Sequence, residues 1–454
     1  MDNTTEQLAR YATSLRHEDL TPAAVHAAKR LLIDSFACAV GAYDSEPVRI
    51  AAGLAAETGG ALQATLWPTG QRCAYDAAAF ANGVMVRYLD YNDTYMSLEA
   101  SHPSDMFAAL LALAEARGAN GRDTLLALVA ACEIEMCLAD SCNLFNKGFD
   151  HGLYIGLGTA AGAGRLLGLS LEQMGHALSL ACTPNVPTRQ TRSGELTMWK
   201  GCAASAAARS ALFAAQLAAR GMTGPTEAFE GRHGLFEQVT GRFALAPLAE
   251  AGGSFGVERS GIKYLPTEYN SQLPLYQILQ LRQQVPLEQI EAIEVEVYHF
   301  TFTEIGSEPA KWRPTTRETA DHSLPYMLAV TLLDGGISVE SFTPERIADP
   351  RLPPLMDRIR IRENADFSRR YPETMDCRIT VRTRDGRSLV EHGSYPRGHG
   401  KNPMSDAEVE AKFHALCANV LPRAQADALL RAVWAFDSVD MAGLWPLLRR
   451  PQAG

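Results

Sequence analysis

The chain has 454 residues, of which 46% are hydrophobic and 21% are charged, and its formal net charge is -10. A chain of this length is expected to form two or three domains around a large core. The acidic balance argues against nucleic-acid binding, which needs a basic face to meet the phosphates. No stretch reaches the roughly 18 consecutive apolar residues of a membrane span, and the start lacks a signal-peptide pattern. We therefore expect a cytoplasmic protein with no nucleic-acid or membrane partner.

The nine cysteines are odd in number and form no CxxC pair. Cys132, Cys137 and Cys142 are spaced by five, so they diverge around a helix and cannot share one metal ion. Free, buried thiols are the expected state. The chain also lacks a Walker A pattern, a GxGxxG after a strand and an HExxH helix, so no motif predicts a nucleotide or metal cofactor.

Residues 1 to about 260 are typical of successive helices. Thr21-Pro22 begins one helix, Pro103 begins another that ends at Gly118, and Asp123 is expected to cap a third over residues 124–140. The segments 152–168 and 203–219 are rich in glycine and alanine. Small side chains of this kind let helix backbones approach closely. The pattern predicts a compact helical bundle.

The pattern changes after about residue 261. Residues 292–298 and 358–362 alternate as half-buried strands do, 377–381 is a third strand candidate, and Asp385-Gly386 predicts a hairpin turn into 388–390. A helix is expected over 322–334, and Ser405 caps a return to helices. The predicted fold is mainly α: a large all-helical domain (residues 1–260 and 403–454) and a smaller α+β lid domain (residues 261–402).

Two histidines in the helical part are candidates for acid–base chemistry. His102 directly precedes Pro103, at the edge of a helix start where free N–H groups attract anions and favour a neutral imidazole. His151 follows Asp150 and precedes a small-residue helix. A capping or structural histidine is the alternative at both places. A polar segment from Asp90 to Thr94 follows an apolar helix, and it is compatible with either a turn or a site.

Cations gather further along the chain. Arg189, Arg192 and Lys200 fall within 12 residues, beside an alanine-rich helix. A buried lysine needs a partner, and arginine and lysine bind carboxylates strongly. Two interpretations of these cations are therefore open: a site that binds substrate carboxylates, or a solvent-exposed charged face. Lys263 lies where the helical and mixed patterns meet, a usual position for a small-molecule cleft. A surface-linker lysine is equally compatible with that position.

Together these segments resemble the MmgE/PrpD family over nearly the whole chain. The resemblance is carried by Leu32-Ile33-Asp34-Ser35-Phe36, Leu89-Asp90-Tyr91-Asn92-Asp93-Thr94, Ser101-His102-Pro103-Ser104-Asp105, Trp199-Lys200-Gly201, Gly221-Met222-Thr223-Gly224-Pro225, Ile262-Lys263, Leu332-Leu333-Asp334-Gly335-Gly336 and Asn402-Pro403-Met404-Ser405. It implies a helical domain with a smaller lid, an active site between the two, a homodimer, and no required metal or cofactor.

The resemblance also implies site residues. The matching catalytic positions are Asp90, His102, His151, Lys200 and Lys263. Substrate contacts are expected from Thr94, Arg189, Arg192, Tyr326 and His322. The family has a tyrosine near the lid, for which Tyr298 and Tyr326 are both candidates.

The implied activity is that of a cofactor-independent lyase acting on a small di- or tricarboxylate, resembling either a 2-methylcitrate dehydratase or a cis-aconitate decarboxylase. Removing a proton beside a carboxylate builds negative charge there, which cations stabilise, while one imidazole serves as base and the other as acid. An epimerase of an amino- or imino-dicarboxylate would need the same groups. A carboxylate-binding homologue without catalysis and a helical scaffold are the remaining alternatives.

Overall fold

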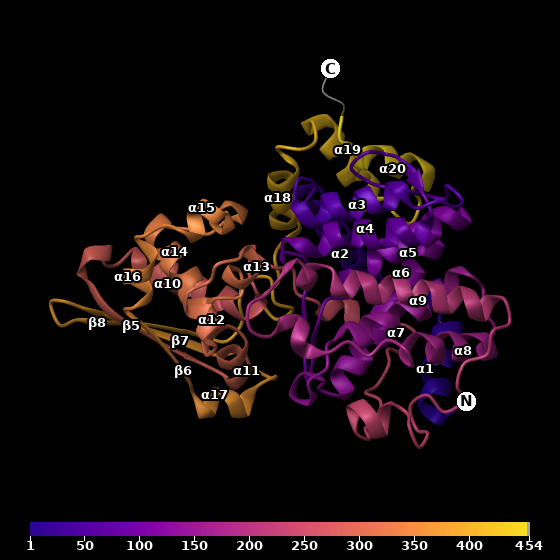
Figure 1. Ribbon diagram of the computed structural model, residues 1–454, viewed down its shortest axis with the longest axis horizontal. Coiled ribbons are helices and arrows are strands. Elements are labelled where there is room, and N and C mark those ends of the chain that lie inside the picture. Colours follow the sequence, from indigo (N-terminus) through magenta and orange to yellow (C-terminus); the bar gives the residue numbers. More distant parts are fainter. Residues whose placement is uncertain (452–454) are drawn as a thin grey trace. The chain divides into compact units, whose positions relative to one another are not determined.

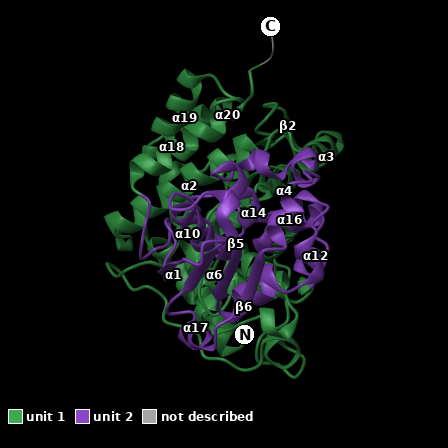
Figure 2. Ribbon diagram, turned by 90° about the vertical axis from the view of Figure 1, so that its left-hand side faces the viewer, with its two compact units in different colours: residues 1–189, 201–262, 405–454 green, residues 190–200, 263–404 purple. Residues whose placement is uncertain are grey.

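A computed structural model describes residues 1–451, which form two compact units (Figures 1 and 2). Unit 1 comprises Met1–Arg189, Gly201–Ile262 and the chain from Ser405 onward, and unit 2 comprises Gln190–Lys200 and Lys263–Met404. The segment 190–200 was expected in the helical domain but clusters with unit 2. The backbone N–H of Leu196 donates to the Thr319 hydroxyl at 2.9 Å, and its carbonyl accepts from the Thr316 hydroxyl at 3.0 Å.

Unit 1 is built from helices. They are α1 (Asn3–Ser14), α2 (Pro22–Gly41), α3 (Glu46–Glu57), α4 (Tyr75–Tyr88), α5 (Phe107–Arg117), α6 (Gly121–Ser141), α7 (Gly152–Leu166), α8 (Leu171–Cys182), α9 (Ala203–Ala219), α18 (Asp406–Cys417), α19 (Arg423–Trp434) and α20 (Met441–Leu448). Unit 1 also contains two antiparallel pairs of two-residue strands. Strand β1 (Ala64–Thr65) pairs with β2 (Arg72–Cys73), and β3 (Tyr95–Met96) pairs with β4 (Ala100–Ser101). The helical character predicted from the sequence is confirmed.

The glycine-rich face of α7 packs directly on α6. A β-carbon at Gly158 would lie 2.7 Å from the Ala131 carbonyl oxygen, and one at Gly162 would lie 2.8 Å from that of Ala127. Both distances are too short for any side chain, so the two backbones approach as closely as the small residues predict.

Two of the three predicted N-caps are confirmed. Thr21 accepts a hydrogen bond from the Ala24 N–H at the start of α2, and Ser405 accepts one from Glu408 at the start of α18. The third expected cap was wrong. Helix α6 begins at Gly121, and the Asn120 side chain accepts from the backbone N–H of Asp123 at 2.8 Å. Asp123 is therefore inside the first turn, where its charge still suits the helix dipole.

Unit 2 contains a four-stranded mixed sheet in the order β6-β5-β7-β8. Its strands are β5 (Ile290–Val297), β6 (Ile359–Glu363), β7 (Cys377–Thr383) and β8 (Ser388–Gly393). Strand β6 runs parallel to β5, and the other neighbours are antiparallel. Its helices are α10 (Gln272–Arg282), α11 (His299–Thr301), α12 (Pro309–Trp312), α13 (Arg317–Ala320), α14 (Leu324–Asp334), α15 (Pro344–Ile347), α16 (Leu352–Met356) and α17 (Ala365–Arg370). All four predicted strands and the predicted helix before residue 334 are present, so the mainly α fold with a smaller α+β part is confirmed.

The alternation along β5 separates core from surface. Ile293, Val295 and Val297 are buried in the core of unit 2, on the face that α10 and α14 cover in Figure 1. Glu296 between them forms ion pairs with Arg362 at 3.2 Å and Arg378 at 3.3 Å on neighbouring strands. A strand with one buried face has this pattern.

All nine cysteines are free and buried, as predicted. Among residues 1–451, every helix is too short or too polar to cross a bilayer.

Candidate functional site

The polar segment after α4 is buried in unit 1, and its backbone is strained. Asp90 has φ +50°, and among residues 1–451 it is the one non-glycine residue with a left-handed backbone. This conformation costs a residue with a side chain on the order of 1–3 kcal/mol and is retained mostly where the surroundings fix it, commonly at functional sites. The side chains of Asp90, Asp93 and Thr94 are all buried.

Arg87, in the last turn of α4, holds this segment together. It is 1% exposed. Its Nη1 donates to Asp90 Oδ1 at 2.6 Å, its Nη2 lies 3.1 Å from His102 Nε2, and its Nε lies 3.5 Å from Asp105 Oδ2. Arg87 therefore connects two predicted catalytic residues. The sequence analysis missed it, although a single cation in an otherwise apolar helix end must find buried partners.

His102 is bound through both ring nitrogens. Its Nδ1 lies 2.7 Å from the Asp93 carbonyl oxygen and 3.2 Å from the Thr94 hydroxyl, while Nε2 faces Arg87. Unit 1 thus brings Asp90, Thr94 and His102 together, although their roles in turnover stay predictions. No side-chain capping bond was found from His102 to the 3-10 helix Pro103–Met106 that follows it.

His151 lies directly before α7 and meets His102 edge-on. The two ring centroids are 5.4 Å apart and the planes are inclined by 64°. The Asp150 carboxylate lies 3.9 Å from His151 Nδ1, which is beyond hydrogen-bond range, and it accepts from the Gly152 backbone N–H at 3.0 Å. Two buried imidazoles in one place can take and return a proton.

Two buried carboxyl groups belong to the same part of unit 1, Asp93 and Glu135. The Asp93 carboxyl accepts from the Ser104 N–H at 3.1 Å and from the Ser260 hydroxyl at 3.0 Å, and burial raises its pKa to about 7. Burial also raises the pKa of Glu135 well above its ordinary value, partly offset by the Ser101 hydroxyl. These acids are available in their protonated form at a pH where exposed carboxyl groups are ionised.

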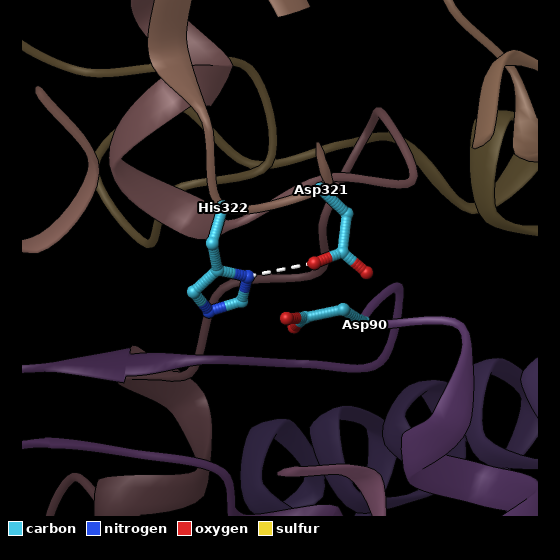
Figure 3. A group of neighbouring side chains, drawn as sticks. All are labelled: Asp90, Asp321 and His322. Carbon is cyan, nitrogen blue, oxygen red and sulfur yellow. Dashed lines mark hydrogen bonds and ion pairs between the residues drawn. The ribbon is translucent and has the colours of Figure 1, made fainter. Parts of the chain in front are cut away.

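Unit 2 contains a second charged cluster around Asp321. Lys200 Nζ donates to Asp321 Oδ1 at 2.6 Å, Arg317 Nη1 lies 3.1 Å from Oδ2, and His322 Nδ1 lies 2.7 Å from Oδ1; the last contact is the dashed line in Figure 3. Burial opposes ionisation of Asp321, but Lys200, His322 and Arg317 outweigh it and lower its pKa. The sequence predicted that Lys200 needs a partner, but it did not identify Asp321.

These carboxylates are already neutralised by protein cations. Asp90 is paired with Arg87 in unit 1, and Asp321 with Lys200 and Arg317 in unit 2. A divalent ion binds best where carboxylates lack such partners, so neither cluster by itself offers a good metal site.

The other predicted residues have different surroundings. Lys263 and Arg192 are buried, at 1% and 5% exposure. The Arg189 guanidinium lies 4.4 Å from the centroid of the Phe145 ring in unit 1. The Tyr326 hydroxyl donates to the Ser341 carbonyl at 2.6 Å within the hydrophobic core of unit 2. A substrate contact by any of them stays a prediction.

The comparisons with known proteins follow the two-part organisation of the chain. The MmgE/PrpD N-terminal domain matches residues 6–247, and the MmgE/PrpD C-terminal domain matches residues 265–437. The chain belongs to the MmgE/PrpD family. Within this MmgE/PrpD chain the N-terminal match includes the Arg87, His102 and His151 group, and the C-terminal match includes Asp321 and His322.

Relatives of this chain in the MmgE/PrpD family include enzymes of two kinds. Cis-aconitate decarboxylase from Homo sapiens is 26% identical over 469 residues, which cover 98% of this chain and 95% of that protein. The 2-methylcitrate dehydratase from Cupriavidus necator is 29% identical over 395 residues, covering 81% and 79%. The enzyme of that name from Escherichia coli K12 is 28% identical over 392 residues, covering 81% and 79%.

Proposed function

We propose that the protein is a cofactor-independent lyase that acts on a small di- or tricarboxylate by moving a proton next to a carboxylate. The observation that carries this proposal is the buried contact between the His102 and His151 rings, 5.4 Å apart. Two imidazoles shielded from bulk water provide a base and an acid for a single elimination. The names of the relatives support a dehydration or a decarboxylation.

Cations are needed because deprotonation beside a carboxylate places negative charge on that group. Lys200, Lys263 and Arg192 are buried, and we propose that they bind the substrate carboxylates. Charges fixed in advance stabilise the developing anion without rearrangement. The Asp321 carboxylate at 2.6 Å holds the Lys200 ammonium in one place.

The direct test is incubation with citrate, 2-methylcitrate and cis-aconitate in deuterated water, followed by proton NMR. A lyase converts at least one acid into a product with a new alkene or with one carboxylate fewer. Deuterium uptake at carbon without net conversion would instead indicate an epimerase. Ligand-induced thermal stabilisation with neither turnover nor exchange would contradict catalysis and favour a binding protein.

Removing an imidazole tests the proton-transfer role. We expect His102→Ala to lower turnover at least about a hundredfold, the usual size of a general acid–base contribution. His233→Ala, at an exposed histidine, is the matched control and should retain wild-type turnover. A folded His102→Ala protein with full activity would remove His102 from the mechanism.

Metal independence is tested by dialysis against EDTA. Because Asp90 and Asp321 are both paired with protein cations, we expect turnover to be unchanged within error. Activity that disappears and returns with Zn²⁺ or Fe²⁺ would overturn the cofactor-independent part of the proposal.

We further propose a cytoplasmic homodimer, as the family resemblance implies. Sedimentation equilibrium of the purified protein should then give about twice the chain mass of 49.3 kDa. A monomer over the micromolar range would contradict this assembly.

A further inference from the structure

The contact between Arg87 and His102 fixes which ring nitrogen carries the proton. Every nitrogen of an arginine side chain donates and none accepts. Arg87 Nη2 lies 3.1 Å from His102 Nε2, and both side chains are buried. Nε2 must therefore accept this hydrogen bond, so it carries a lone pair and no proton.

The opposite side of the ring leads to the same tautomer. His102 Nδ1 lies 2.7 Å from the backbone carbonyl oxygen of Asp93, which can only accept. Nδ1 must donate there, so the single ring proton of a neutral imidazole is on Nδ1. The Thr94 hydroxyl oxygen at 3.2 Å then accepts from the same N–H. Two independent contacts agree on one neutral form.

We propose that Arg87 is a positioning residue that holds His102 neutral, with its proton on Nδ1 and its basic lone pair on Nε2. A guanidinium keeps its charge at any working pH. A permanent positive charge within hydrogen-bond distance of Nε2 disfavours a second proton there. His102 consequently begins each turnover as a base, a consequence that rests on the proposed lyase function.

Arg87 cannot turn away from the ring, because carboxylates hold its other nitrogens. Asp90 accepts from Nη1 at 2.6 Å, and Asp105 lies 3.5 Å from Nε. In unit 1, Arg87 from α4 and His151, directly before α7, contact the ring, and the backbone carbonyl of Asp93 accepts from it, while Asp90 and Asp105 pair with Arg87.

The tautomer can be read in the wild-type protein without a substrate. Selective ¹⁵N labelling of the histidines and long-range ¹H–¹⁵N NMR distinguish a proton on Nδ1 from one on Nε2, and His102→Gln assigns the signals. We expect an Nδ1–H pattern that persists to about pH 5.5, roughly one unit below the ordinary histidine pKa. A proton on Nε2, or titration near the ordinary value, overturns the proposal.

Variants at Arg87 test its role. In Arg87→Gln the charge is lost, so we expect the titration midpoint of His102 to rise by about one pH unit, and the acid limb of the kcat/KM profile to move with it. Arg87→Lys keeps the charge but cannot reach Asp90 and His102 together. It should keep the low midpoint while turnover falls about tenfold.

Arg165→Gln is the matched control. Arg165 is a half-buried arginine at the end of α7 that donates to the Ala12 carbonyl, and its loss should move neither the midpoint nor the tautomer. An unchanged His102 midpoint in Arg87→Gln contradicts the proposal. If Arg87→Gln does not fold, the wild-type spectrum and Arg87→Lys still decide. The predicted tautomer in a protein that converts no acid would contradict the lyase function alone.

Discussion

Lys311 in unit 2 is a buried amine that lacks a close acceptor. Its side chain is 0% exposed, its Nζ lies 3.7 Å from Glu308, and no hydrogen-bond acceptor for it was found within residues 1–451. Burial lowers its pKa, against the opposing effect of Glu304 and Glu308. Charged at neutral pH, this amine destabilises the fold by the cost of desolvation.

We therefore expect Lys311→Met to stabilise the protein by about 1–3 kcal/mol at pH 7. Because the folded pKa of Lys311 is lowered, the unfolded chain binds more protons, and wild-type stability rises as pH approaches 10.5, the ordinary value for lysine. The advantage of the variant should thus shrink between pH 7 and pH 9.5 in urea unfolding. Lys147→Met, at an exposed lysine, is the control. Destabilisation by Lys311→Met would show that the ammonium has a strong partner.

At the scale of elements, helix α18, the first helix after residue 405, is fixed to the segment that carries Asp90. Lys412 Nζ lies 2.5 Å from Asp34 in α2 and donates to the Tyr91 carbonyl at 2.7 Å. It also lies 3.7 Å from the centroid of the Tyr91 ring. One buried ammonium therefore connects helices α2 and α18, which are far apart in the sequence, to the strained turn after α4.

Removing this ammonium leaves the buried Asp34 charge uncompensated. We expect Lys412→Met to cost about 3–5 kcal/mol, the usual loss on breaking a buried pair. The double variant Lys412→Met with Asp34→Leu should regain most of that loss. Denaturant unfolding of both single variants and the double variant measures the coupling. Additive losses would mean that the two residues do not stabilise each other.

At the scale of the whole molecule, buried acids make stability depend on pH. Burial raises the pKa values of Asp93 and Glu99 to about 7, from 3.8 and 4.5. Between about pH 4 and 7 these two carboxyl groups therefore bind more protons in the folded chain than in the unfolded chain. The contribution of these groups to stability falls as pH rises through this window, and it is lowest above pH 7.

Asp93→Asn removes one of these titrations while keeping the Oδ1 oxygen that accepts from Ser104, and its amide NH2 replaces the Oδ2 oxygen that accepts from Ser260. We expect the Tm of this variant, relative to wild type, to increase from pH 5 to about pH 7 and then to level off towards pH 8, because Asp93 is ionised in both states above its folded pKa. Thermal melts at half-unit steps would measure the difference. A Tm difference that does not vary with pH would show that Asp93 does not titrate in this range. Glu99→Gln should behave in the same direction.

Local physics was enough to predict the four strands of unit 2 and several of the longer helices. Alternation along residues 292–298 predicted β5, and the Thr21 and Ser405 caps predicted the starts of α2 and α18. The sequence also identified several polar residues that the fold buries. Backbone preference, capping and the spacing of apolar residues all act within a few positions of the chain. Even a local prediction can select the wrong residue: the sequence predicted Asp123 as the N-cap of α6, but the N-cap is Asn120.

Tertiary structure decided the partners. Arg87 and His102 are 15 positions apart, and Lys200 and Asp321 are 121 positions apart. No local sequence pattern predicts either pair. The family motifs identified His102 and Lys200 as site residues. They did not identify Arg87, which contacts His102, or Asp321, which pairs with Lys200. A buried charge selects whichever opposite charge the packed fold brings within reach, and that choice depends on long-range contacts rather than on the adjacent sequence.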